Sequence, residues 1–116
     1  VIEALSEWRL AGKIPVTGHD ADLSACQRII EGTQLMTVYK PIRKLAYRAG
    51  ELAMLLAKNQ EISTNSPAVY NGKNYIPAEI ITPISIDQSN INIIIEDEFH
   101  KPEDIYRNLP YDARQF

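Results

Sequence analysis

Two charged side chains stand where short runs of β-branched residues end. Asp20 follows the run "KIPVTGH", and Lys40 closes the run "TQLMTVYK". A carboxylate only accepts hydrogen bonds and an ammonium only donates them. Such a pair can form a salt bridge, which on an exposed loop stabilises a fold by at most about 1 kcal/mol. It can also hold a polar ligand that donates to Asp20 and accepts from Lys40, and the residue types alone leave both interpretations open.

The neighbours of Asp20 suggest support for that carboxylate and no metal centre. His19 is predicted to orient or support Asp20, and Asp22 is a favoured N-cap for the helix that follows it. Calcium loops need several oxygen ligands at set spacing and a distant bidentate Glu, which are absent. Zinc sites need Cys and His at defined spacing, but Cys26 falls inside a predicted helix and His100 is remote. We therefore expect neither a metal nor a cofactor.

The chain shows no pattern typical of an enzyme. Nucleophilic catalysis needs a nucleophile beside a base, and acid–base catalysis commonly needs two carboxylates with separated roles. Ser24 has no evident partner, Asp22 is better explained as a helix cap, and Cys26 as a small buried side chain. A binding function is the expectation that remains.

Composition sets outer limits. The chain has 116 residues, is 45% hydrophobic and carries a net charge of −3, which suits one small domain with a modest core. The mild acidity argues against a nucleic-acid partner, and no apolar run approaches the roughly 20 residues of a membrane span. The first twelve residues read as a helix already under way, so we expect the chain to be the later part of a longer protein.

The first 40 residues predict a strand–helix–strand unit after that opening helix, which Gly12 would end. Residues 13–18 suggest a short buried strand, and residues 33–40 a second strand. Between them a helix over 23–32 would bury one face, made of Ala25, Cys26, Ile29 and Ile30. A connection of this length suits parallel strands. Ligands in such sheets bind beyond the carboxyl ends of the strands, so Asp20 and Lys40 should lie at one edge.

The remainder predicts one long helix and several extended segments. Residues 42–58 repeat apolar residues at helical spacing, which indicates a buried stripe made of Ile42, Leu45, Ala46, Ala49, Leu52, Ala53 and Leu56. The chain then turns polar up to a tight turn at Asn71-Gly72. Pro77 and Pro83 make residues 75–86 an edge strand or a strap. Residues 91–95 suggest a buried strand or short apolar element.

Longer motifs carry a resemblance to a known family. The segment "GHDADL…RIIEGTQLMTVYKPI", followed by "IITPISID…NI" and "DEFHK", resembles the sugar-binding proteins of ABC importers, which have the type I periplasmic-binding fold. The resemblance implies an α/β protein of two lobes, each a parallel sheet with flanking helices, joined by hinge-crossing segments. This chain would be the C-terminal third.

The resemblance also divides the chain. Residues 1–40 would end the C-terminal lobe and carry the sugar site, and residues 41–60 would form a helix returning to the N-terminal lobe. Residues 61–101 would form the hinge strap and terminal strands, and residues 102–116 a surface tail that docks in part.

The implied function is binding of D-xylose, or a close pentose, in the cleft between lobes, and delivery to a membrane permease. Asp20 and Lys40 match the family's sugar contacts, and other contacts would lie in the remaining N-terminal part of the protein. His19 departs from the family, which carries Gln there, and would make affinity pH-dependent if it touches the ligand or supports Asp20. The implied location is the periplasm, or the extracellular face of the cytoplasmic membrane with a lipid anchor.

Two other functions share this fold. One is a sugar sensor that docks on a membrane signalling receptor of the histidine-kinase type and does not feed transport. The other is a repressor-type ligand-binding domain, against which the sugar-binding signature weighs. The importer and sensor functions need the same pocket, so Asp20 and Lys40 do not separate these two.

Overall fold

The computed structural model describes residues 1–113, which form two compact units. One unit contains Val1–Lys40 together with the chain from Pro83 onward, and the other contains Pro41–Thr82. The chain therefore leaves the first unit after Lys40 and re-enters it at Pro83. No helix among the described residues is long and apolar enough to cross a membrane.

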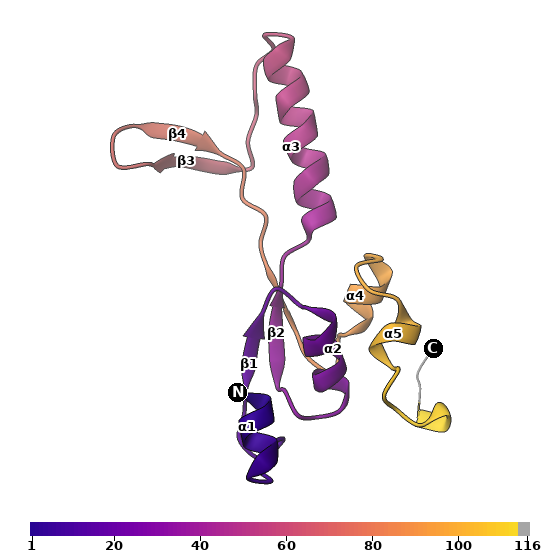
Figure 1. Cartoon of the computed structure of the whole chain (residues 1–116). Helices are drawn as coiled ribbons and strands as arrows, with labels where there is room; N and C mark the ends of the chain where they lie inside the picture. The colour runs from indigo at the N-terminus through magenta and orange to yellow at the C-terminus, as the bar shows by residue number, and fades with distance from the viewer. Residues whose placement is uncertain (114–116) are drawn as a thin grey trace. The chain divides into compact units, whose positions relative to one another are not determined.

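The first unit is built on a three-stranded mixed sheet in the order β1-β2-β5. Figure 1 shows β1 and β2 side by side. Its strands are β1 (Thr17–His19), β2 (Met36–Tyr39) and β5 (Ile84–Ile86). β1 and β2 are parallel, as predicted, whereas β5 runs antiparallel to β2 and lies at the edge. β1 begins later than expected because Pro15 has no N–H to donate to a ladder, and Ile14 is exposed.

Helix α2 (Leu23–Ile30) connects the two parallel strands and buries the predicted face of Ala25, Cys26, Ile29 and Ile30. Its end is a Schellman motif: the N–H of Gly32 donates to Ile29 O at 3.1 Å, and that of Thr33 to Arg28 O at 2.9 Å. Gly32 has φ +76°, which glycine adopts without steric cost. A local signal in the sequence thus placed this helix end correctly.

The opening helix is shorter than predicted. Helix α1 spans Ile2–Glu7, and the chain turns at Arg9, which has φ +55°. Gly12, expected to end the helix, has φ +77° and lies in the turn that follows. None of the α1 residues is buried, so no packed face extends the helix to Gly12.

The core of the first unit lies between the sheet and three helices. Two of these come late in the chain, α4 (Asn92–Glu96) and α5 (Pro102–Ile105), and a 3-10 turn spans Tyr111–Ala113. The segment expected as a buried strand or short apolar element is α4, which buries Ile94. The core cluster comprises Ala21, Cys26, Ile30, Tyr39, Ile86, Ile91, Ile94, Ile105 and Tyr106.

The segment 102–116, expected as a surface tail that docks in part, packs against the unit at Ile105 and Tyr106. Ile105 and Tyr106 are only 1% and 5% exposed, and Gln27 of α2 donates to the Asp104 carbonyl at 2.8 Å. A half-apolar face on a short helix was too weak a signal to show which residues dock. Residues 114–116 of the same segment lie outside the described residues.

The second unit contains α3 (Ile42–Ala57) and a hairpin of β3 (Ser66–Tyr70) and β4 (Tyr75–Ala78). The Asn71 side chain closes the predicted turn by accepting the N–H groups of Lys73 and Asn74 at 3.0 and 2.9 Å. β3 lies in the polar segment before the turn, for which the sequence pattern predicted no strand. Both strands belong to a two-stranded ribbon, so Pro77 indeed lies on an edge.

Arg48 fastens α3 to the chain that returns along it. Its guanidinium lies 3.1 Å from Glu79 Oε1, and it donates to the Ser63 carbonyl at 2.7 Å. The predicted stripe of α3 is not buried, however: no α3 residue is, and Ile42, Leu45 and Leu56 are more than half exposed. Helical periodicity identified an apolar face, but no described element of this unit covers it.

Candidate functional site

Asp20 and Lys40 meet at the carboxyl edge of the sheet. β1 ends at His19 and β2 at Tyr39, so each charged residue directly follows its strand. The strands are parallel with His19 opposite Val38, which brings the two loops side by side. The Lys40 ammonium donates to Asp20 Oδ1 at 2.7 Å. The expectation that they share one edge is confirmed, and in this structure they form a salt bridge.

Both donors on Asp20 converge on the same oxygen. His19 Nδ1 lies 2.9 Å from Oδ1, the atom that Lys40 also contacts. Within residues 1–113 no donor reaches Oδ2. The Asp20 side chain is 60% exposed, so Oδ2 is an acceptor open to an external group. His19 thus has the supporting position that the sequence suggested.

The electrostatics keep Asp20 ionised. The hydrogen bond from Lys40 and, next, that from His19 hold the pKa of the Asp20 carboxyl below its usual 3.8. An ionised carboxylate accepts hydrogen bonds from hydroxyl groups more strongly than a neutral acceptor does. The corner therefore presents a fixed acceptor beside a fixed donor.

The turn that carries Asp20 has a left-handed backbone. Asp20 has φ +73° and Ala21 has φ +51°, a conformation that costs energy for residues other than glycine. Ala21 is fully buried, and its N–H donates to Thr37 Oγ1 on β2 at 3.2 Å. Strained backbone of this kind persists only where neighbouring groups hold it, and it concentrates at binding sites.

Two neighbours of the turn have structural roles. Asp22 occupies the N-cap position of α2 as predicted, and its carbonyl accepts from Cys26 N at 3.0 Å, but its carboxylate makes no capping hydrogen bond. Cys26 is buried, and desolvation raises the pKa of its thiol to about 11. It is therefore a packed side chain with a weakly donating S–H, directed at the Ala21 carbonyl 3.5 Å away.

His100 is the residue that sequence reasoning missed. Its Nε2 lies 2.8 Å from the Ala21 carbonyl oxygen, although 79 positions separate the two residues. No spacing signal could have shown this contact. Residues 1–113 contain no group of three or more His, Cys, Asp or Glu placed to hold a metal ion.

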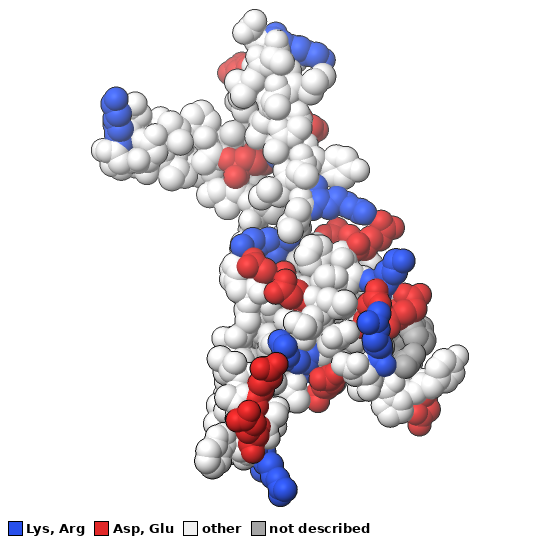
Figure 2. All heavy atoms as spheres, viewed as in Figure 1, with Lys and Arg blue, Asp and Glu red and all other residues white. Residues whose placement is uncertain are grey.

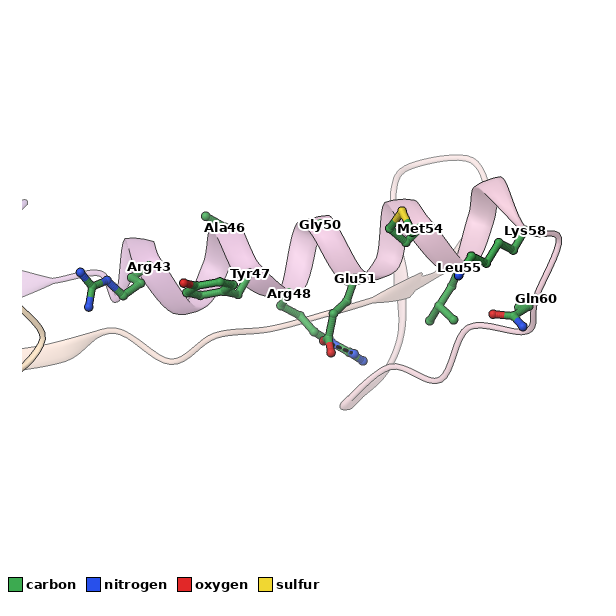
Figure 3. A pocket seen from close by; sticks show the side chains of 10 residues that line it. All are labelled: Arg43, Ala46, Tyr47, Arg48, Gly50, Glu51, Met54, Leu55, Lys58 and Gln60. Carbon is green, nitrogen blue, oxygen red and sulfur yellow. Dashed lines mark hydrogen bonds and ion pairs between the residues drawn. The ribbon is translucent and has the colours of Figure 1, made fainter.

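Two hollows of the described chain lie away from this corner. A groove of about 860 Å³ lies along α3 in the second unit. Figure 3 shows Tyr47 next to the Arg48–Glu51 ion pair, with Met54 and Leu55 further along the helix. Apart from Gln60 and Lys58, only α3 itself lines the groove, so it is an uncovered helix face and not an enclosed cavity. A smaller hollow of about 350 Å³ lies where β1 and β2 begin, at the opposite end of the strands from Asp20.

Charge is mixed around the candidate site. On the face shown in Figure 2, acidic and basic side chains are interspersed over the unit that contains Asp20 and Lys40. No stripe of one sign is visible on that face, whereas a nucleic-acid footprint normally forms a basic one.

Comparison with known proteins places this geometry in a class. No protein-family model matches the chain. It is 49% identical over 106 residues to a D-xylose-binding periplasmic protein of Haemophilus influenzae, and 43% identical over 105 residues to that of Escherichia coli. Each match covers 90% of this chain but 32% of the relative, so the chain spans about a third of their length.

A solved structure agrees. The chain is similar to a carbohydrate transporter solute-binding protein from Chloroflexus aurantiacus, solved in complex with D-glucose, with a TM-score of 0.70 and 31% identity. The match covers 77% of this chain and 26% of the solved one. The chain thus has the fold of one part of the type I periplasmic sugar-binding proteins, as its motifs predicted. Within that class it resembles the D-xylose-binding periplasmic proteins, and its homologues are periplasmic solute-binding proteins, which are not enzymes.

Proposed function

We propose that the protein binds a monosaccharide, D-xylose or a close pentose, at the Asp20–Lys40 corner and presents it to a membrane ABC importer. The observation that carries this proposal is the geometry of Asp20: both protein donors share Oδ1, and Oδ2 stays open beside the Lys40 ammonium. The names of the two D-xylose-binding relatives supply the sugar. Their periplasmic location is proposed for this protein too.

The chemistry of a sugar suits this corner. A bound sugar loses water from its hydroxyl groups, and each unpaired hydroxyl costs about 1–3 kcal/mol. Asp20 accepts from one or two hydroxyls, while Lys40 donates to a hydroxyl oxygen and keeps the carboxylate in place. A sugar that lacks the matching hydroxyl leaves a desolvated charge without a partner, which gives the site its specificity.

The rest of the site lies outside this chain in our proposal. An aromatic platform and further polar contacts would come from the remaining N-terminal part of the protein, as the family resemblance implies. The chain leaves the first unit after Lys40 and returns at Pro83, which fits connections that cross a hinge. Lys40 would then be both a ligand contact and the last residue before one crossing.

Isothermal titration calorimetry of the full-length protein with xylose, ribose, glucose and arabinose tests the proposal. We expect xylose to bind, and Asp20→Ala and Lys40→Ala each to weaken binding about 10- to 100-fold, because each loses a hydrogen bond to a charged group. Asp104→Asn is the matched control: it removes the exposed ion pair with Arg107, in the same unit but away from the corner.

The outcomes separate the possibilities. Undiminished binding in both corner variants means that Asp20 and Lys40 form only a salt bridge. Failure to bind any sugar overturns the proposal. Transport is tested by restoring xylose uptake in cells that lack their own xylose-binding protein; binding without restored uptake favours the signalling receptor as partner.

A further inference from the structure

A four-residue segment, Asp97–His100, contacts the neighbours of both site residues. It follows α4 and comes from the part of the chain that re-enters the first unit. His100 contacts Ala21, the residue after Asp20, and Asp97 contacts Tyr39, the residue before Lys40. Neither contact reaches the charged corner directly.

The contact with Ala21 holds the strained turn. A carbonyl oxygen only accepts, so His100 Nε2 carries the hydrogen in the 2.8 Å bond to Ala21 O. The peptide unit before it, between Asp20 and Ala21, is held as well, because Ala21 N–H donates to Thr37 Oγ1. Since Asp20 and Ala21 are both left-handed, the direction of the Asp20 side chain depends on these two anchors.

The contact with Tyr39 holds the end of β2. The Tyr39 hydroxyl donates to Asp97 Oδ2, and its ring packs against Phe99 with centroids 5.0 Å apart. Phe99 in turn packs against the His100 ring at 4.5 Å. Tyr39 is 1% exposed, so the strand end that precedes Lys40 has one packed position. The two contacts therefore form one continuous cluster of Tyr39, Asp97, Phe99 and His100, which we name the clamp.

We propose that the clamp sets the geometry of the sugar site, with His100 positioning Asp20 through Ala21 and Asp97 positioning Lys40 through Tyr39. These are positioning residues and make no contact with the sugar. The inference rests on the proposed function and adds Asp97, Phe99 and His100, which lie at least 57 positions from either site residue in the sequence. It assigns the C-terminal segment a part in ligand affinity.

Xylose titration of full-length variants tests the clamp. His100→Phe keeps a ring against Phe99 but removes the donor, and we expect about a three- to tenfold weaker affinity. His100→Gln places an amide N–H near the position of Nε2 and should restore most of that loss. Tyr39→Phe keeps the packed ring, removes the hydroxyl bond to Asp97, and should also weaken binding.

Gln27→Ala is the matched control. Gln27 also connects α2 to the C-terminal segment, because its side chain donates to Asp104 O at 2.8 Å. It contacts neither Asp20 nor Lys40. The substitution should lower the melting temperature and leave xylose affinity unchanged. The proposed role of the clamp is contradicted if His100→Phe and Tyr39→Phe bind xylose with wild-type affinity. It is also contradicted if Gln27→Ala weakens xylose binding as much as they do. A wild-type protein that binds no sugar overturns the proposed function and this inference together.

Discussion

At the scale of single residues, the two oxygens of the Asp20 carboxylate have different surroundings, and the proposed sugar contact depends on that difference. Lys40 and His19 both lie against Oδ1, at 2.7 and 2.9 Å, and leave Oδ2 to an external donor. The same two neighbours lower the pKa of the Asp20 carboxyl, so the acceptor remains charged in mildly acidic surroundings.

A carboxyl titration by carbon-13 NMR checks this account in the full-length protein. We expect the Asp20 midpoint below 3.8 in the wild type and a higher midpoint in Lys40→Met, since the Lys40 hydrogen bond is the larger cause. Asp87 is the internal control, because hydrogen bonds from Ser89 lower its pKa independently of Lys40. An unchanged Asp20 midpoint in Lys40→Met would contradict the assignment.

The lowered pKa of Asp20 determines how the contribution of the salt bridge to stability changes with pH. Because the folded-state pKa of Asp20 lies below its ordinary value, the salt bridge stabilises the fold above about pH 5 and loses that effect as the pH falls through the folded-state pKa. Lys40→Met should therefore lower the melting temperature at pH 7 and make little difference at pH 2.

At the scale of elements, α2 is the part whose limits the chain encodes locally. Its start has Asp22 at the N-cap position, its buried face follows the helical period, and its end is the Schellman motif at Gly32. In contrast, α3 has an equally regular apolar face that nothing described in its unit covers. Arg48, Glu79 and Ser63 hold α3 to the returning chain through polar contacts instead.

Substitution of Gly32 tests the helix end. A Cβ there would meet no atom within 4 Å, so Gly32→Ala is penalised only through its φ of +76°. We expect the free energy of unfolding to fall by about 1 kcal/mol, measured by urea titration of the full-length protein. Gly32→Asn is the matched variant and should lose less, because Asn tolerates the left-handed region. Equal stability of Gly32→Ala and the wild type would show that this conformation is not retained.

At the scale of the whole molecule, both units expose several large hydrophobic side chains. Among them are Trp8 at 77%, Leu35 at 58% and Leu56 at 61%. The chain also spans only about a third of its D-xylose-binding relatives. Exposed hydrophobic side chains on a chain that matches only part of its relatives suggest surfaces that pack against the rest of the protein.

We therefore predict that residues 1–116 do not form a stable monomer when produced alone. Analytical ultracentrifugation should show association that grows with concentration, and circular dichroism should show a broad thermal transition. Addition of the remaining N-terminal part of the protein should sharpen that transition by covering the exposed faces. A cooperative, concentration-independent melt of the monomeric fragment would refute this.

The sequence by itself determined features that depend on neighbouring residues: the limits and buried face of α2, the β2 strand, the turn at Asn71-Gly72, and the approach of Asp20 to Lys40 at the ends of parallel strands. Its motifs also determined the class. Only the tertiary structure decided that Ile105 and Tyr106 are buried, that the α3 stripe is uncovered within its unit, and that His100 holds Ala21. The physical reason is the sequence separation between the residues that interact. Periodicity and turn chemistry act over a few residues, whereas a contact between positions 79 apart depends on how complete elements pack, which no local pattern records.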